Sequence, residues 1–195
     1  ASLYLILSLL RLIEQAHLRM RYLVMFLLLG QLMACSHTPT KHQENNWSFS
    51  GKIGITTPKE SVAGFIQWQQ QQDAFDIYVT GPLGQGSTRI QGTPDKATLT
   101  QGGEIHEGID PQKMIYEQLG WFFPLKNLPF WLQGKQAPFS LAKTEVKDGK
   151  LAKLEQDLWD VEFQRYHAYY GLPERIKIRQ GKWKFLIVVK NWSVE

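Results

Sequence analysis

Two pairs of polar residues have the types that metal binding or acid–base catalysis requires. Glu104 precedes His106 by two positions, so both side chains would share one strand face, but no cluster of cysteines and histidines accompanies them. Asp160 and Glu162 also share a strand face, yet they alternate with apolar residues, which is typical of a solvated face. The sequence has no Gly-x-Ser-x-Gly motif, phosphate loop or dinucleotide fingerprint. We therefore expect no enzyme activity, no catalytic residue, no metal and no cofactor.

An apolar run near the N-terminus ends at the chain's single cysteine. Met20-Arg21 gives the run a positive start, and Tyr22–Met33 is short for a bilayer span. This layout is typical of a secretory signal peptide, which we place at residues 1–34. Residues 1–19 could be upstream translated sequence. The alternative is that residues 1–29 form one long helix or membrane anchor, although charged and polar residues interrupt it.

The cysteine itself, Cys35, follows a small residue, Ala34. The sequence Leu32-Met33-Ala34-Cys35 resembles the lipobox of bacterial lipoproteins, in which the cysteine is lipidated and becomes the first mature residue. In such lipoproteins, serine rather than aspartate after the cysteine implies release to the outer membrane. The polar residues 35–46 would then be a lipidated tether. The alternative is an unmodified, buried cysteine, and a single cysteine allows no internal disulfide.

Alternating apolar residues predict an antiparallel sheet in residues 47–195, as in Trp47, Phe49, Gly51, Ile53 and Ile55. About ten strands are expected, at residues 47–55, 62–68, 75–79, the stretch that ends at Gly92, 97–100, 104–106, 151–155, 159–165, 175–179 and 183–189.

Two helices are expected between the sixth and seventh of these strands. Asp110-Pro111 can cap and begin the first helix, which Gly120 ends. The second is expected in residues 125–132, where Pro129 could confine it to the later part. The fold class is therefore mainly β with some α: a curved antiparallel sheet covered on one side by helices.

The charge is too small to indicate nucleic acid as a partner. The net charge is +4, and residues 1–34 supply +2 of it through three arginines and one glutamate. Five basic residues near the C-terminus could face an acidic partner or anionic headgroups, although a solvated face is the simpler reading: Arg175, Lys177, Arg179, Lys182 and Lys184.

Aromatic residues are frequent, with seven tryptophans in the chain. Each could simply fill the core, but together they could line a cavity for an apolar ligand. The candidate lining residues are Trp47, Phe49, Ile66, Trp68, Phe75, Ile77, Trp131, Trp159, Phe163, Trp183 and Phe185.

The turn Gly81-Pro82-Leu83-Gly84 has an apolar tip, whereas turns normally carry polar residues. Its leucine either protrudes or folds back onto the sheet.

This turn and several other motifs resemble the LolB family of outer-membrane lipoproteins. The further motifs are Gly64-Phe65-Ile66-Gln67-Trp68-Gln69-Gln70, Pro124-Leu125, Trp131-Leu132-Gln133-Gly134 and Asn191-Trp192. The resemblance implies an unclosed β-barrel of ten or eleven strands, with helices over a hydrophobic cavity.

The resemblance also implies a function. The chain would accept lipoproteins from the periplasmic carrier LolA, bind their acyl chains and insert them into the outer membrane. It would be anchored there, face the periplasm and contact outer-membrane lipid through Pro82 and Leu83. We expect a monomer. The alternatives are a periplasm-facing scaffold or assembly lipoprotein without lipid transfer, and a carrier of small lipids.

Overall fold

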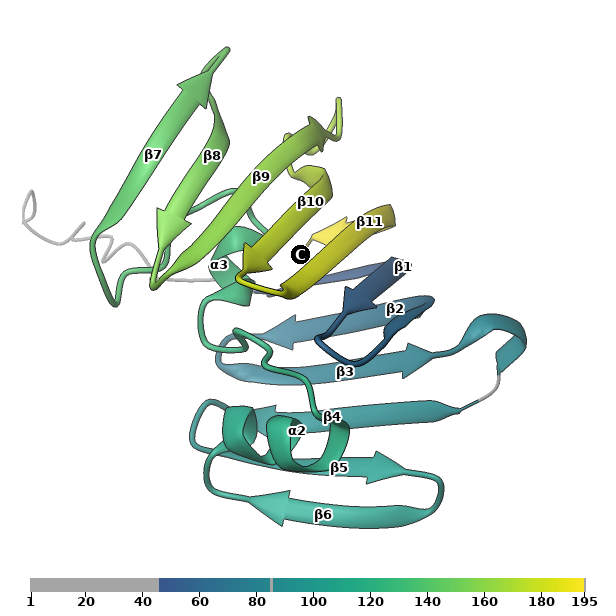
Figure 1. Cartoon of the computed structure of the whole chain (residues 1–195). Helices are drawn as coiled ribbons and strands as arrows, with labels where there is room; N and C mark the ends of the chain where they lie inside the picture. Colours follow the sequence, from purple (N-terminus) through teal and green to yellow (C-terminus); the bar gives the residue numbers. More distant parts are fainter. Residues whose placement is uncertain (1–45, 85, 195) are drawn as a thin grey trace, which may run out of the picture. The chain divides into compact units, whose positions relative to one another are not determined.

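The computed structural model describes residues 46–84 and 86–194, which belong to one compact unit, Gln43–Glu195. The expected signal peptide, Cys35 and nearly all of the tether lie outside the described residues. Within them, eleven strands form one antiparallel sheet in the order β6-β5-β4-β3-β2-β1-β11-β10-β9-β8-β7. The two outermost strands, β6 and β7, do not pair with each other, so the sheet curves without closing (Figure 1). The expected unclosed antiparallel sheet is confirmed.

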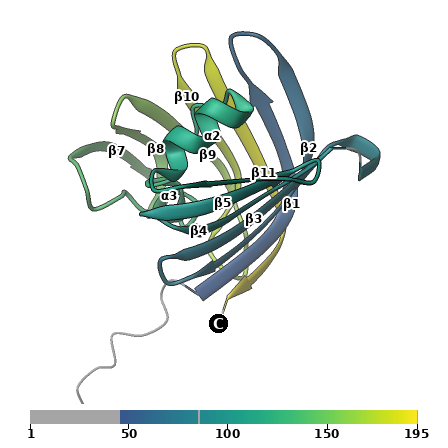
Figure 2. The ribbon, with the colours of Figure 1, turned by 90° about the horizontal axis from the view of Figure 1, so that it is seen from below.

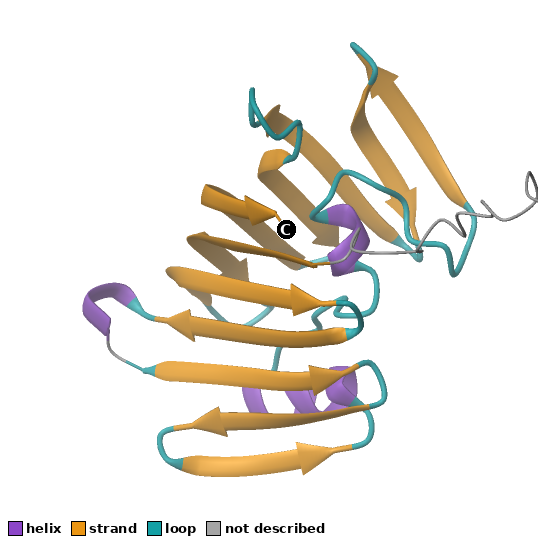
Figure 3. Cartoon of the chain, turned by 180° about the vertical axis from the view of Figure 1, so that it is seen from behind, coloured by secondary structure: helices purple, strands orange, loops and turns teal. Residues whose placement is uncertain are grey.

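Each strand pairs with the next strand in the chain, except that helices separate β6 from β7; the first and last strands, β1 and β11, also pair with each other (Figure 3). The strands are β1 (Asn46–Thr56), β2 (Ser61–Gln71), β3 (Ala74–Thr80), β4 (Ser87–Thr93), β5 (Lys96–Gln101), β6 (Glu104–Gly108), β7 (Ala142–Lys147), β8 (Lys150–Gln156), β9 (Trp159–Tyr166), β10 (Pro173–Gln180) and β11 (Trp183–Val194). The helical elements are α2 (Pro111–Leu119), α3 (Leu128–Trp131) and the 3-10 turn η2 (Pro82–Gly84).

The core lies on the concave side of the sheet, where α2 and α3 also pack (Figure 2). In β1, Phe49, Ile53 and Ile55 are buried, while Lys52 between them is exposed. This alternation follows from the two-residue period of a strand, which places successive side chains on opposite faces. The apolar pattern of the sequence therefore identifies the face that the helices cover.

Helix α2 begins and ends where the sequence indicates. The Asp110 carboxylate accepts a hydrogen bond from the backbone N–H of Lys113 at 3.0 Å, and Pro111 occupies the first turn. Gly120 has a left-handed backbone, with φ of 66°, and donates its N–H to the carbonyl of Tyr116. Helix α3 is shorter than the expected 125–132, because Pro129 has no N–H and fits only the first turn.

The sequence pattern missed strand β7. Its residues are exposed except for partly buried Ala142, so no apolar alternation marks it. It lies at the sheet edge and pairs antiparallel with β8, and Lys153 Nζ of β8 lies 2.9 Å from Glu145 Oε2 of β7. A charged, solvated edge strand of this kind opposes pairing with another chain.

Tyr166, at the end of β9, packs under the turn that follows α3. Its hydroxyl donates to the carbonyl of Leu151 at 2.7 Å, and a Cβ on Gly134 would lie 3.1 Å from that hydroxyl oxygen. Burial raises the pKa of Tyr166 to about 12.

Because the folded state keeps this proton more tightly than the unfolded state, we expect stability to fall as pH rises from the usual tyrosine pKa of about 10 toward 12. Urea unfolding of the parent and Tyr166→Phe over this range measures the slope. The parent should lose stability more steeply than the variant, and equal slopes would contradict the prediction.

Candidate functional site

The concave side of the sheet contains a cavity of about 1250 Å³. Its apolar walls include Phe75 from β3, Trp183 from β11, and Phe122, Leu125 and Phe130 from the segment around α3. A ligand pocket is usually about 300–1,000 Å³, so this cavity has room for a long apolar molecule. Transfer of such a molecule from water to aromatic and aliphatic walls is favourable, because it removes apolar surface from water.

Charged side chains lie around this apolar surface. Asp73, Asp95 and Asp110 contribute carboxylates, and Lys113 and Lys126 contribute ammonium groups. A site with apolar walls and ionic groups at its edge suits a ligand with an apolar body and a polar end.

A buried glutamine, Gln156 of β8, fixes the wall formed by residues 124–141. Its Oε1 accepts hydrogen bonds from Trp131 Nε1 and from the backbone N–H of Ala137, both at 2.9 Å. Its Nε2 donates to the carbonyls of Ala137 at 2.7 Å and Ser140 at 3.0 Å. One side chain that is 2% exposed thus holds both α3 and the segment that follows it.

A second contact supports the same wall from the turn between β8 and β9. Asn127, just before α3, donates its Nδ2–H to Asp157 Oδ2 at 2.7 Å. The hydrogen bond from Asn127 holds the pKa of the Asp157 carboxyl below its usual value. The wall is therefore attached to the sheet at two points.

The turn between β3 and β4 presents Leu83 to solvent, with 93% of the residue exposed. Its φ of 64° is left-handed, a conformation that costs a leucine about 1–2 kcal/mol. The Gly84 N–H donates to the carbonyl of Gly81 at 3.1 Å and closes the turn. At its base, a Cβ on Gly64 would lie 2.1 Å from the Thr80 carbonyl oxygen, so this close approach requires glycine. The leucine thus protrudes rather than folding back.

The eleven residues expected to line a cavity all lie on the concave side, but only two reach the main cavity surface, Phe75 and Trp183. Phe49 and Trp68 are buried and adjoin a second, mostly polar pocket of about 730 Å³. The remaining seven are buried in the core: Trp47, Ile66, Ile77, Trp131, Trp159, Phe163 and Phe185.

Sequence reasoning missed Phe122, Phe130 and Phe139 as wall residues. For Phe122, the available signal was the apolar run Trp121-Phe122-Phe123-Pro124, which lies between the two expected helices and outside any expected strand. Phe122 stacks on Trp159 at 5.7 Å and contacts Trp183 at 6.3 Å between ring centroids. It therefore connects the buried aromatic core with the cavity wall.

The polar pairs considered for chemistry lie apart from this cavity. His106 Nε2 is 3.7 Å from Glu104 Oε2, and no group of three His, Cys, Asp or Glu side chains gathers as a metal site among residues 46–84 and 86–194. Glu162 accepts a hydrogen bond from Gln164, which lowers the pKa of its carboxyl, and faces Lys177 at 3.8 Å. No helix in the part of the chain that the structure describes is long and apolar enough to cross a membrane.

Comparison with known proteins identifies the family. The family model described as outer membrane lipoprotein LolB matches residues 45–192. The chain is 41% identical over 153 residues to the outer-membrane lipoprotein LolB of Stutzerimonas stutzeri strain A1501, a match that covers 76% of this chain and 74% of that protein. It is 40% identical over 152 residues to the LolB of Pseudomonas fluorescens strain Pf-5, with the same coverage.

A solved structure of a LolA superfamily protein from Nitrosomonas europaea shares 10% identity, with a TM-score of 0.46 over 77% of this chain and 86% of that one. The match of the family model to most of the chain and the identity of about 40% to its members show that this chain belongs to the LolB family of outer-membrane lipoproteins.

Proposed function

We propose that this outer-membrane lipoprotein receives other lipoproteins from a LolA-like periplasmic carrier, holds their acyl chains in the cavity and inserts them into the outer membrane. The observation that carries this proposal is the cavity of about 1250 Å³ with apolar walls, in a sheet that does not close. Burying one methylene contributes about 0.8 kcal/mol, so exposing a long acyl chain to water costs on the order of 10 kcal/mol. A receptor must therefore offer the chain a continuous apolar path.

The anchor in this proposal is lipid on Cys35, with residues 1–34 removed as a signal peptide and residues 35–46 as the tether. The described domain would then work as a monomer that faces the periplasm. Its own cavity is free for cargo, because the anchor's acyl chains are in the bilayer.

Leu83 is the proposed point of contact with the acceptor membrane, together with Pro82. Its exposed side chain can gain roughly 1.5–3 kcal/mol by entering a bilayer. This is too little to anchor a protein, so Leu83 acts on the bilayer during delivery. Holding a leucine at positive φ opposes stability and therefore supports a functional reason for the exposed tip.

A Leu83→Glu substitution should separate acceptance of cargo from its insertion. Radiolabelled lipoprotein on the purified carrier is mixed with the receptor, first alone and then with liposomes. We expect normal transfer to the variant, because the cavity is unchanged, but little insertion, because a carboxylate is strongly disfavoured in the hydrocarbon region.

Leu158→Glu is the matched control, because Leu158 is also an exposed turn leucine at positive φ, with 88% of it exposed and φ of 67°. The control should insert cargo as the parent does. If Leu83→Glu also inserted cargo normally, the proposed role of Leu83 would be wrong. If the parent and the control both failed to accept cargo from the carrier, the receptor function itself would be wrong.

A scaffold lipoprotein without lipid transfer would be expected to have a closed core, and the large apolar cavity disfavours it. Binding of a fluorescent fatty acid tests this alternative. A carrier of small lipids would bind the same probe but would not receive lipoprotein from the protein donor.

A further inference from the structure

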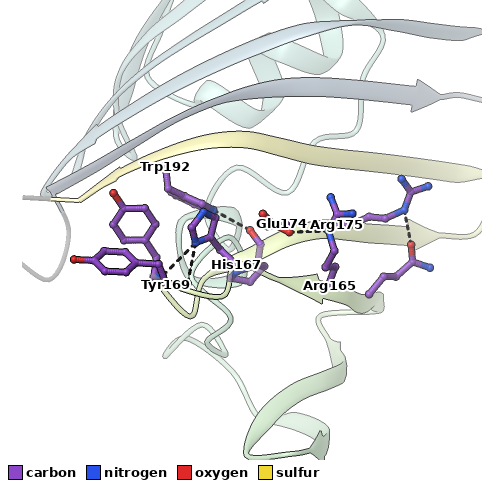
Figure 4. Close-up of polar contacts among 9 residues, drawn as sticks. Arg165, His167, Tyr169, Glu174, Arg175 and Trp192 are labelled. Carbon is purple, nitrogen blue, oxygen red and sulfur yellow. Dashed lines mark hydrogen bonds and ion pairs between the residues drawn. The ribbon is translucent and has the colours of Figure 1, made fainter.

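The turn between β9 and β10 has a fixed backbone that rests on His167 (Figure 4). The Nδ1 atom of His167 accepts hydrogen bonds from the backbone N–H groups of Tyr169 and Tyr170, both at 3.2 Å. The backbone N–H of His167 donates to the Leu172 carbonyl at 2.7 Å, and that of Gly171 donates to the His167 carbonyl at 2.9 Å. These four bonds hold a short turn in one conformation.

This fixed turn displays aromatic surface to solvent. Tyr169 is 85% exposed and Tyr170 is 42% exposed. Their ring centroids lie 4.9 Å apart at 85°, and the His167 ring lies 4.9 Å from that of Tyr170. A rigid pair of exposed tyrosines loses little conformational entropy when it binds, which is the property of a contact surface.

The turn lies at the strand ends where the described chain begins. Trp192 of β11 donates its Nε1–H to the Pro173 carbonyl at the start of β10, at 3.0 Å. The Trp192 ring also contacts Trp47 of β1, at 5.7 Å between centroids. The start of β1, the end of β11 and the start of β10 are thus side by side.

From this geometry we propose that Tyr169 and Tyr170 form a bilayer contact, seated at the headgroup level of the membrane that anchors the chain. The inference rests on the proposed lipidation of Cys35. The chain from Cys35 to Asn46 can span at most about 40 Å, at 3.3–3.6 Å per residue, so the start of β1 stays within that distance of the bilayer. Confinement raises the effective concentration of the surface, and a weak contact becomes significant.

Tyrosine suits this position because its ring is apolar and its hydroxyl is polar, a combination enriched where hydrocarbon meets water. The neighbouring cations are already engaged: Arg165 Nε is 2.7 Å from Glu174 Oε2, and Arg175 Nε donates to Gln164 Oε1 at 2.8 Å (Figure 4). The Arg165 charge is thus offset by a carboxylate, whereas the Arg175 guanidinium is hydrogen-bonded to a neutral amide and keeps its charge.

This surface is distinct from the Leu83 turn. Leu83 follows the end of β3, where Thr80 pairs with Phe65, and thus lies at the opposite end of the strands from the start of β1. Both surfaces can touch one bilayer together only when the strands lie along it.

The test uses the mature lipidated chain reconstituted into vesicles of phosphatidylethanolamine and phosphatidylglycerol. A Tyr169→Cys variant carries the one free thiol, because Cys35 is occupied by lipid, and is labelled with an environment-sensitive fluorophore. We expect a blue shift of its emission and loss of emission when the vesicles contain brominated lipid. Leu158→Cys, also exposed but in the turn before β9 at the other strand end, is the matched control and should show neither effect.

Flotation of the protein with the vesicles reports the anchor separately, so failure of the anchor and failure of this contact are distinguished. An anchored Tyr169→Cys protein whose label is not quenched overturns the proposal. Equal quenching at positions 158 and 169 also overturns it, because the contact is then not confined to the tether end. A label at position 169 that responds to the purified carrier but not to lipid overturns the bilayer contact as well, and shows that this surface binds a protein instead.

Discussion

Replacing Gln156 with leucine should lower the free energy of unfolding by roughly 3–5 kcal/mol, because several buried polar groups would lose their partner together. These groups are Trp131 Nε1, the N–H and carbonyl of Ala137, and the carbonyl of Ser140. Leucine fills a similar volume, so the loss reports hydrogen bonding rather than a cavity in the core. The same change should loosen the cavity wall and weaken binding of a fluorescent fatty acid.

The matched control is Gln70→Leu, a second buried glutamine that also accepts from a tryptophan. Gln70 Oε1 accepts from Trp68 Nε1 at 3.0 Å, and its Nε2 donates to the Gln72 carbonyl at 2.7 Å. Gln70 therefore satisfies fewer groups, all within its own hairpin, and we expect a smaller loss. Urea unfolding of both variants checks this order. Equal losses would show that Gln156 has no special role in fixing the wall.

The role of Gln156 was not predictable from the sequence, and the reason is physical. Its position on β8 shows that it faces inward, because Leu154 two residues earlier is a core residue. Its partners are between 16 and 25 residues away, in a segment that has little regular structure. A strand pattern specifies faces and says nothing about which loop will cover a polar side chain.

The same limit explains the cavity. The alternating pattern predicts that the strand residues of this set, such as Phe75 and Trp183, share one face, and they lie on the concave side, whereas Trp131 was predicted on a helix. Whether such a residue is covered or open depends on where residues 121–141 lie across the sheet. Trp131 is completely buried because it belongs to that covering segment, whereas Trp183 remains at the cavity surface. The apolar periodicity thus predicts which side chains face the concave side of the sheet, but not which of them remain open to the cavity.

Local signals gave the rest of the fold, because they act over a few residues. Asp110, Pro111 and Gly120 define α2 by capping chemistry alone. The turn with Leu83 at its tip was identifiable because glycines flank a residue that turns rarely carry, although the sequence left open whether the leucine protrudes or folds back. Strand β7 was missed because its only support is pairing with β8, which leaves no apolar signature.

Gly51 marks the point where the pairing of β1 with β11 changes register. Ser50 pairs with Asn191 and Gly51 with Val189, so Lys190 is an extra residue that forms a bulge. The bulge turns Trp192 inward, where it is 6% exposed and contacts Phe49 at 5.3 Å between ring centroids.

A Gly51→Ala substitution should therefore lower the free energy of unfolding by roughly 3 kcal/mol or more, because the backbone of the neighbouring strand would have to move to admit one methyl group. A Cβ at this position would lie 2.2 Å from the Val188 carbonyl oxygen, which cannot withdraw without separating the two central strands. Urea or thermal unfolding measures the loss, and a lower proportion of folded protein on expression should accompany it.

Gly54→Ala is the control on the same strand, three residues further along. The nearest atom to its added Cβ would be Leu186 Cβ at 3.9 Å, an ordinary contact distance. The free energy of unfolding of this variant should be about 0.5–1 kcal/mol higher than that of the parent, because alanine restricts the unfolded chain more than glycine does. If both variants were equally stable, the bulge at Lys190 would tolerate a side chain opposite it. The inward position of Trp192 would then not depend on the close approach at Gly51. Packing of the aromatic cluster alone would have to set the register between β1 and β11, the two strands that join the halves of the sheet.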